Sequence, residues 1–283
     1  MREIKIVRTL RDLRGQIWEW RGSGETIGFV PTMGALHDGH LSLIRLSHKH
    51  TSKSVASIFV NPTQFAPGED FESYPRTEEA DVAALASAGC DLVYIPEPGS
   101  MYEENHSTSI HITGVAESLE TDYRPTFFDG VAIVVAKLLN RCAPDVAIFG
   151  EKDYQQLATI RRLVIDLDMP VEIVGAPIAR DKHGLALSSR NQYFDADGLA
   201  LARKLNVIMR DCAEKMRGGM NVDLAAAQAK QTFLDTGFES VDYVSVASTH
   251  SLTPLAGGIL DRPARLLIAL HCKGVRLIDN CEI

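Results

Sequence analysis

The sequence contains no block of lysine and arginine residues. Its 283 residues carry 37 acidic and 29 basic side chains, which gives a formal net charge of −8 at pH 7. A nucleic-acid partner would call for a basic face, because its phosphates must be neutralised. We therefore expect no nucleic acid among the partners. A local basic pocket for a small anion is compatible with this charge.

Paired cysteines and long apolar runs are also lacking. The five cysteines are scattered, odd in number and without a C-x-x-C pair, which disfavours a disulfide framework and a zinc site. We expect free thiols in a reducing compartment. Residues 1–14 are charged throughout, unlike a secretory signal, and no apolar run is long enough to cross a bilayer. The sequence thus predicts a cytoplasmic protein that spans no membrane.

Strand and helix patterns alternate over residues 1–177. Short apolar runs predict strands at residues 4–7, 26–30, 54–60, 91–95, 146–149 and 171–174. Apolar residues at helical spacing predict helices at residues 9–20, 41–50, 77–88, 131–141 and 154–167. This alternation predicts an α/β domain with a Rossmann-like, doubly wound parallel sheet. Residues 105–112 alternate in polarity and predict a further strand, and residues 124–130 predict a loop.

Residues 178–283 have a different pattern and predict a smaller C-terminal α+β domain. Long helical patterns occupy residues 195–217 and 224–234, and strand patterns occupy residues 241–246, 265–271 and 275–278. Cys272-Lys273-Gly274 lies between the last two strands and predicts a hairpin turn.

The stretch Pro31 to Leu41, P-T-M-G-A-L-H-D-G-H-L, joins a predicted strand to a predicted helix. Gly34 and Gly39 lack a Cβ, so a ligand can approach the backbone closely. The unpaired N–H groups and the positive dipole end of a helix N-terminus favour a phosphate there. His37 and His40 would add two side-chain donors, so the pattern predicts a nucleotide-phosphate site.

A metal site is the alternative interpretation of this histidine pair, since histidine is the commonest metal ligand. Such a site usually needs a third ligand and both histidines on one helix face. Asp38-Gly39 lies between the two histidines and suits a turn better than a helix interior. The flanking strand, helix and glycines favour the phosphate interpretation.

Three further polar segments follow predicted strands or mark the domain junction. Asn61 and Gln64 carry amides that can bind hydroxyls and a carboxylate, although Asn-Pro is also a common turn. Lys152 and Asp153 open a helix and can bind phosphate and a sugar hydroxyl, or simply cap that helix. Residues 187–191, L-S-S-R-N, suit a triphosphate whose charge grows during reaction, or form a linker.

Together these motifs carry a family resemblance. P-T-M-G-A-L-H-D-G-H, I-F-V-N-P-T-Q-F, Y-P-R-T, F-G-E-K-D-Y-Q-Q-L, L-A-L-S-S-R-N and the ending R-L-I-D-N occur in this order. The set closely resembles the pantothenate synthetase (pantoate–β-alanine ligase) family, which looks like the class I aminoacyl-tRNA synthetase core. The first motif alone is shared with many nucleotidylyl transferases, whereas the combination is highly specific.

The resemblance implies a reaction in which ATP and Mg²⁺ are used to join (R)-pantoate to β-alanine. The pantoate carboxylate attacks the α-phosphorus and releases diphosphate, and β-alanine then attacks the pantoyl adenylate and releases AMP. It also implies a homodimer. The Mg²⁺ would be held mainly by the ATP phosphates, with Asp81 as a candidate additional ligand, and by no site made of protein ligands alone.

The resemblance also assigns residues. It implies catalytic roles for His40 as the acid, His37, Lys152 and Arg190. It implies an ATP site made of Met33, Gly34, Ala35, Leu36, His37, Asp38, Gly39, His40, Gly150, Glu151, Lys152, Asp153, Ala179, Leu187, Ser188, Ser189 and Arg190. Within that site Lys152 would contact phosphate, Asp153 ribose and the Ala179 backbone adenine. Gln64, Gln156 and Asn61 would bind pantoate and β-alanine.

One departure from the family pattern stands out. The family commonly has R-P-G-H-F-x-G-V, and here Thr126-Phe127 replaces the Gly-His pair. We expect an effect on substrate affinity or loop motion. The sequence does not decide whether the loop at residues 66–75 closes as a lid.

Two other functions remain open at this stage. A different nucleotidylyl transferase would lack the paired Gln64 and Gln156. A binding or regulatory protein on a retained scaffold would have lost Lys152, Ser188, Ser189 or Arg190, and all four are present.

Overall fold

The chain forms two compact units in this computed structural model, which describes residues 4–66 and 68–283. The first unit contains the N-terminal residues through 112 together with residues 124–151 and 159–177. The second contains residues 113–123, 152–158 and 178–283. The last change of unit falls after residue 177, and the two internal segments 113–123 and 152–158 also belong to the second unit.

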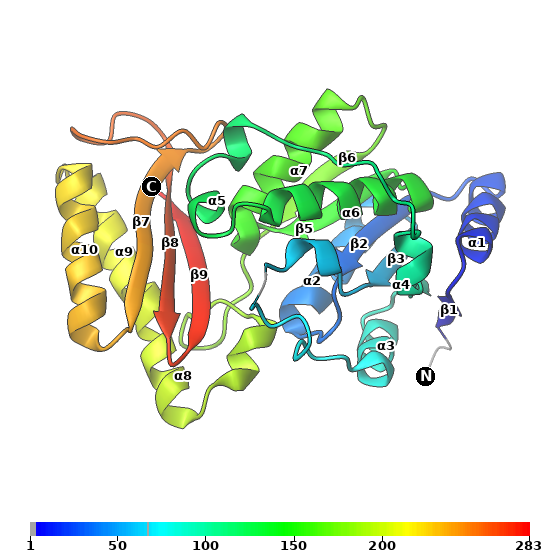
Figure 1. The fold of residues 1–283 in the computed structure, drawn as a ribbon, viewed down its shortest axis with the longest axis horizontal. Helices are drawn as coiled ribbons and strands as arrows, with labels where there is room; N and C mark the ends of the chain where they lie inside the picture. The colour runs from blue at the N-terminus through cyan, green and yellow to red at the C-terminus, as the bar shows by residue number, and fades with distance from the viewer. Residues whose placement is uncertain (1–3, 67) are drawn as a thin grey trace. The chain divides into compact units, whose positions relative to one another are not determined.

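A six-stranded parallel sheet forms the centre of the first unit (Figure 1). Its strands are β1 (Lys5–Val7), β2 (Ile27–Thr32), β3 (Lys53–Ile58), β4 (Leu92–Tyr94), β5 (Val146–Gly150) and β6 (Glu172–Ala176). Every described pairing is parallel, and the spatial order is β1-β4-β3-β2-β5-β6. The predicted α/β fold with a doubly wound parallel sheet is therefore confirmed.

Helices follow most of these strands. They are α1 (Leu10–Gly22), α2 (Asp38–His50), α3 (Glu78–Ser87), α4 (Pro98–Met101), α5 (Glu120–Tyr123), α6 (Phe127–Cys142) and α7 (Tyr154–Asp166). Short 3-10 turns, η1 to η4, occupy Pro62–Gln64, Gly114–Ala116, Glu151–Asp153 and Ser189–Tyr193. No helix in the described parts of the chain is long and apolar enough to cross a membrane.

The sheet is buried on both faces because helices cover each of them. Val30, Ala56 and Ile148 point to one face and form a core cluster with Leu41 and Ile44 of α2. Their neighbours in sequence, including Phe29, Val55 and Ala147, point to the other face and are also buried. The nearly continuous apolar character of these strands, which the sequence shows, follows from this two-sided burial.

The strand order reverses between β2 and β5, and this is where the architecture favours a ligand. From β2 the chain continues to β3 and β4 on one side, and it later returns to place β5 on the other side of β2. In open α/β sheets, ligands bind beyond the carboxyl ends of the strands at such a switch point. The segments that leave these two ends begin at Met33 and Glu151.

The second unit is built on a three-stranded antiparallel sheet (Figure 1). Its elements are α8 (Ala196–Ala202), α9 (Lys204–Arg217), α10 (Val222–Thr236), β7 (Ser240–Ser248), β8 (Ala264–Cys272) and β9 (Val275–Glu282). The predicted hairpin joins β8 to β9, and Lys273 and Gly274 both have positive φ, 50° and 76°. A two-residue turn with this backbone matches the twist of the strands. The predicted α+β unit is confirmed.

Three sequence-based secondary-structure predictions were wrong. Residues 105–112 form no strand, because most of their side chains are exposed and no described strand pairs with them. The segment 195–217 forms two helices, separated at Arg203, although no glycine or proline between residues 199 and 217 signals a break. Part of the predicted loop 124–130 is helical, since α6 begins at Phe127.

Candidate active site

The loop after β2 is held in place by a buried carboxylate. Gly34 and Ala35 both have left-handed backbone, with φ of 82° and 49°. The carboxylate of Asp81 accepts the backbone N–H of Ala35 at 3.0 Å and that of Leu36 at 2.8 Å. Its Oδ2 also accepts from the hydroxyl of Thr77 at 3.1 Å, and Asp81 is only 3% exposed. Asp81 therefore determines the path of the chain into the histidine motif.

His37 and His40 cap the N-terminus of α2 reciprocally. Nδ1 of His37 accepts the backbone N–H of Gly39 at 3.1 Å, and Nδ1 of His40 accepts that of His37 at 3.4 Å. The ring centroids are 4.1 Å apart. A neutral imidazole whose Nδ1 accepts carries its proton on Nε2, so each ring can donate from that atom. The helix begins at Asp38, three residues before the predicted start, because of this capping box.

Asn61 is a buried centre of hydrogen bonds that orients Gln64. Its Nδ2 donates to Oε1 of Gln64 and to the backbone carbonyl of Gly130, both at 3.1 Å. Its Oδ1 accepts from the hydroxyl of Tyr102 at 2.9 Å. Nε2 of Gln64 lies 2.9 Å from Sδ of Met33, which belongs to the histidine motif. The structure thus brings Gln64 and Met33 together, as one substrate site in the first unit would require.

Gly130 allows α6 to approach the turn that carries Gln64. A Cβ built on Gly130 would lie 2.2 Å from the carbonyl oxygen of Thr63 and 2.8 Å from Cα of Gln64. Real Cβ atoms do not make backbone contacts this short, so any side chain would displace the turn. Gly130 is therefore the residue that permits the observed position of η1.

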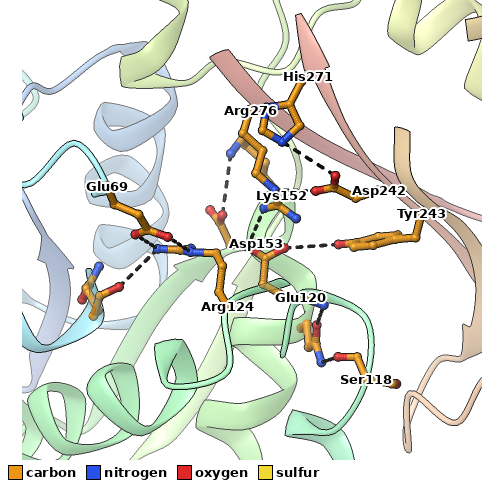
Figure 2. Close-up of polar contacts among 12 residues, drawn as sticks. Glu69, Ser118, Glu120, Arg124, Lys152, Asp153, Asp242, Tyr243, His271 and Arg276 are labelled. Carbon is orange, nitrogen blue, oxygen red and sulfur yellow. Dashed lines mark hydrogen bonds and ion pairs between the residues drawn. The ribbon is translucent and has the colours of Figure 1, made fainter. Parts of the chain in front are cut away.

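Arg124 connects the same turn to the loop that follows it (Figure 2). Its Nε and Nη2 donate to the two carboxylate oxygens of Glu69 at 2.6 and 2.7 Å. Nη2 also donates to the backbone carbonyl of Gln64 at 3.2 Å. The guanidinium lies 3.8 Å from the ring centre of Phe127, one of the two residues that depart from the family pattern. Arg124 therefore stacks on Phe127 while it holds residues 64 and 69.

In the second unit, Lys152 and Asp153 lie in η3, directly after Glu151 of the first unit. Nζ of Lys152 is 3.6 Å from Oδ1 of Asp153, and the Lys152 side chain is 21% exposed. Gln156 is partly exposed and Gln155 is buried. Nε2 of Gln155 donates to the carbonyl of Val115. It also donates to the carbonyl of Ser118, and Oε1 accepts the backbone N–H of Glu120 (Figure 2). Gln155 thus holds residues 113–123, whereas Lys152 and Gln156 remain accessible.

A small hairpin precedes the Ser188–Arg190 segment. Arg180 pairs with Ala186 in an antiparallel bridge, and the N–H of Leu187 donates to the carbonyl of Ala179 at 2.9 Å. Oγ of Ser188 then accepts the N–H of Arg190 at 3.3 Å and caps η4. Ala179 and Leu187 are therefore neighbours, and the hairpin determines where Ser188 and Arg190 begin.

Asp181 stabilises the tip of this hairpin. Its Oδ1 accepts the N–H groups of His183 and Leu185 at 2.8 and 3.0 Å, and its Oδ2 accepts from Nε of Arg203 at 2.8 Å. Partial burial alone would raise the pKa of this carboxyl. The hydrogen bonds from Arg203 and the two amides outweigh that effect and hold the pKa below its ordinary value of 3.8.

The expected site residues therefore divide between the two units. The first unit brings together Met33 to His40, Asn61 and Gln64. It also contains Gly150, the last residue of β5, and Glu151, which follows that strand. The second unit carries Lys152, Asp153, Gln156, Ala179 and residues 187–190. Sequence reasoning missed the roles of Gly130 and of the Arg124–Glu69 pair, although both Arg124 and Gly130 belong to the R-P-T-F-F-D-G-V stretch that it singled out.

The fold is an α/β fold of the kind that binds nucleotides, and the loop from Met33 to His40 leaves its parallel sheet at the switch point, where such folds bind ligands. The sequence profile described as pantoate-beta-alanine ligase matches residues 5–282. The chain belongs to the pantoate–β-alanine ligase family.

Individual relatives agree with this assignment. The chain is 47% identical over 283 residues to pantothenate synthetase of Mesorhizobium japonicum, covering 100% of this chain and 99% of the relative. It is 49% identical over 280 residues to pantothenate synthetase of Paramagnetospirillum magneticum, covering 99% and 98%. The crystal structure of pantothenate synthetase from Thermus thermophilus is 39% identical with a TM-score of 0.91, covering 98% and 99%.

A further solved relative was crystallised with ligands. The pantoate-beta-alanine ligase of Francisella tularensis, complexed with beta-gamma ATP and beta-alanine, is 32% identical to this chain with a TM-score of 0.81. The similarity covers 99% of this chain and 97% of that one.

Proposed function

We propose that this chain performs the reaction of its family, ATP-dependent condensation of (R)-pantoate with β-alanine, with the nucleotide bound beyond β2 and β5. Family membership along nearly the whole chain supports the reaction. The observation that carries the location is that the histidine motif leaves β2 beside the strand end from which Glu151 leaves β5. The same membership argues against the other nucleotidylyl transferases and against a binding protein.

The reaction has two steps. A pantoate carboxylate oxygen forms a bond to the α-phosphorus of ATP, and the bond to the bridging oxygen of diphosphate breaks. The amine of β-alanine then attacks the acyl carbon of pantoyl adenylate, its proton is lost, and the bond to AMP breaks. No protein nucleophile is needed, since the substrate supplies it. Catalysis therefore depends on positioning and on stabilising charge.

The nucleotide-binding role of the first unit rests on the geometry of its loop. In the capping box each Nδ1 of His37 and His40 accepts a backbone N–H, so each ring in its neutral form carries its proton on Nε2. At the N-terminus of α2, such donors add to the helix dipole and favour the phosphates of ATP. We propose that His40 donates to the departing diphosphate and that His37 supports it, with Met33 to Gly39 and Gly150 to Glu151 lining the nucleotide.

The second unit supplies the remaining groups of the proposal. Lys152 would neutralise phosphate charge and Asp153 would accept from the ribose, while the Ala179 backbone would contact adenine. Leu187 to Arg190 follow the hairpin that contains the Arg180–Ala186 bridge. Their two hydroxyls and one guanidinium would stabilise the negative charge that develops on the departing diphosphate. Gln64 and Gln156 would bind pantoate and β-alanine, with Asn61 orienting Gln64.

We propose that Mg²⁺ enters with ATP. Among the described residues, no group of three or more acidic, histidine or cysteine side chains is arranged to hold a metal ion. ATP phosphates would therefore supply most of the ligands, as is usual for Mg²⁺. Asp81 is a poor additional ligand, because its two oxygens already accept from two amides and a hydroxyl in a buried position.

A homodimer in the cytoplasm, with no nucleic-acid partner, completes the proposal. The free cysteines support a reducing compartment such as the cytoplasm. The net charge of −8 argues against a nucleic-acid partner. Light scattering after size exclusion tests the dimer directly, since a mass near 31.0 kDa would identify a monomer.

His40→Ala tests the assigned chemistry. Loss of one strong donor to developing charge typically costs on the order of 10²–10³ in rate, so we expect single-turnover formation of pantoyl adenylate to fall by that order. His50→Ala, in the last turn of the same helix and exposed, is the matched control. Adenylation by His40→Ala at nearly the unmodified rate would refute the role of His40, and diphosphate release without pantoate would refute the substrate.

A further inference from the structure

The ending R-L-I-D-N contains a buried polar pair, Asp279 and Asn280, on β9. Each residue is only 2% exposed. Polar side chains at such positions are costly to bury unless they are fully hydrogen-bonded. Successive residues of a strand point to opposite faces, so Asp279 and Asn280 contact different segments of the second unit.

Asn280 contacts the backbone of Lys152. Its Nδ2 donates to the carbonyl oxygen of Lys152 at 2.9 Å, and its Oδ1 accepts from Nη1 of Arg265 at 2.5 Å. A guanidinium only donates and a carbonyl only accepts, so these two partners determine which end of the amide faces Lys152. Asn280 is thus oriented to hold the first residue that the second unit contributes after β5.

Arg265 reinforces this arrangement from the neighbouring strand β8. Its guanidinium lies 3.7 Å from the ring centre of Tyr154, which begins α7 two residues after Lys152. The hydroxyl of Tyr154 donates to the carbonyl of Thr249 at 3.0 Å. The turn that carries Lys152 and the start of α7 are therefore held by Asn280 and Arg265 of the second unit's sheet and by the carbonyl of Thr249, which follows β7.

Asp279 holds the hairpin that precedes residues 187–190, the other segment predicted to contact phosphate. Its two carboxylate oxygens accept from Nη1 and Nη2 of Arg180 at 2.6 and 2.8 Å. Nη1 of Arg180 also donates to the carbonyl of Gly184 within the hairpin, at 3.0 Å. The backbone N–H of Asn280 donates to Asp279 at 2.8 Å. The adjacent positions 279 and 280 thus connect β9 to the hairpin and to Lys152.

We propose that Asn280 is a positioning residue for the adenylation step, which acts by holding the backbone of Lys152 so that its ammonium meets the ATP phosphates. The proposal rests on the proposed phosphate contact of Lys152. A displacement of about 1 Å at a catalytic group can cost on the order of 10²-fold in rate. In the second step β-alanine attacks the adenylate after diphosphate has already been released. This step therefore does not need the alignment of Lys152 with the phosphates.

Asn280→Asp separates positioning from general stability. The new carboxylate still accepts from Arg265, but it cannot donate to the carbonyl of Lys152 and places a negative oxygen against it. We expect adenylate formation to fall on the order of 10²-fold, whereas the rate of pantothenate formation from pre-formed enzyme-bound adenylate changes less than about twofold. A merely structural residue would lower both rates together, through the fraction of folded enzyme.

Glu282→Gln is the matched control. Glu282 lies on the same strand and accepts from Nη2 of the same Arg265 at 3.0 Å. Its side chain is 77% exposed, and it is not among the residues predicted to bind a substrate. We expect both half-reactions of this variant to equal those of the unmodified enzyme.

A double-mutant cycle with Lys152→Ala tests whether Asn280 acts through Lys152. If it does, Asn280→Asp adds little further loss once the Lys152 side chain is absent, since the two effects are not independent. Full additivity, or equal losses in the two half-reactions, would overturn the proposal while the function of Lys152 stands. Unimpaired adenylation by Lys152→Ala alone would instead overturn the proposed phosphate contact. If Asn280→Asp does not fold, Asn280→Ala serves in the same cycle.

Discussion

Asp81, in the first turn of α3, accepts the backbone N–H of Leu36 at 2.8 Å although the two residues are 45 positions apart in sequence. With the second bond to Ala35, this contact shapes the left-handed turn that leads to His37. The turn would otherwise leave two partly buried N–H groups without this acceptor. The position of the histidine pair thus depends on a carboxylate from another helix.

Asp81→Asn should therefore impair adenylation without touching substrate. An amide offers one acceptor where the carboxylate offers two, so one loop amide loses its partner, at a cost of about 1–3 kcal/mol. We expect adenylate formation to fall about tenfold or more, because the histidines shift. Stopped-flow release of diphosphate measures this rate. Glu79→Gln, an exposed carboxylate on the same helix, should behave as the unmodified enzyme, and equal rates for both variants would contradict the positioning role.

Gly130→Ala should weaken pantoate binding. The added methyl group would meet the Thr63 carbonyl at 2.2 Å, so the turn bearing Gln64 must move. Overpacking of this kind typically costs about 1–3 kcal/mol, and we expect the KM for pantoate to rise more than the KM for ATP.

Gly22→Ala is a suitable comparison for this variant. Gly22 ends α1, and a Cβ added there meets nothing within 4 Å. Its substitution should leave both KM values unchanged. A Gly130→Ala enzyme with an unaltered KM for pantoate would show that the position of η1 does not govern substrate binding.

Lys152→Ala and Gln155→Ala should fail in different ways. The sequence-based expectation is that the loss of Lys152 harms catalysis more, because Lys152 is proposed to contact phosphate. The structure adds a second difference, since Gln155 is 5% exposed and bonds to Val115, Ser118 and Glu120. Removal of its amide leaves buried partners unsatisfied and should lower the free energy of unfolding by about 1–3 kcal/mol.

Two measurements separate these effects. Urea unfolding should detect the destabilisation of Gln155→Ala and little change for Lys152→Ala, whose side chain is partly exposed. Single-turnover adenylation, measured well below each unfolding transition, should show the larger loss for Lys152→Ala. Equal losses in adenylation would argue against a phosphate contact of Lys152.

The alternation of apolar runs was sufficient to predict the parallel sheet, because its central strands β2, β3, β4 and β5 are buried along most of their length and carry a strong apolar signal. The hairpin at Lys273-Gly274 was predictable for a different reason. A two-residue turn needs positive φ at both positions, and the glycine at position 274 signals such a turn. The strand expected at residues 105–112 was wrong because alternation alone does not supply a pairing partner.

The candidate site was predictable where a motif is local and not where its support is distant. His37 and His40 lie three residues apart, and their capping box is written in one short stretch. By contrast, Asp81 supports residues 35 and 36, and Asn280 supports residue 152. Such long-range hydrogen bonds depend on tertiary structure, which one sequence does not reveal through periodicity or spacing.

The departure at Thr126-Phe127 has a structural consequence. Where the family commonly has histidine, Phe127 presents an apolar ring beneath Arg124, at 3.8 Å from the guanidinium. An aromatic face attracts a guanidinium, whereas a protonated imidazole would repel it. The substitution is therefore compatible with the Arg124–Glu69 pair that holds the start of the loop after Gln64.

Asp181 gives a prediction about pH. Its pKa is lowered in the folded protein, despite partial burial, by Arg203 and by the amides of His183 and Leu185. A carboxyl with a depressed folded pKa contributes stability that is fully present above its unfolded pKa and is lost as pH falls through the folded value. Asp181→Asn should thus destabilise the protein at pH 7, and the difference from the unmodified protein should shrink as pH is lowered below about 4. Urea unfolding at several pH values measures this difference. A constant difference from pH 7 to pH 3 would mean that the charge of Asp181 does not stabilise the hairpin.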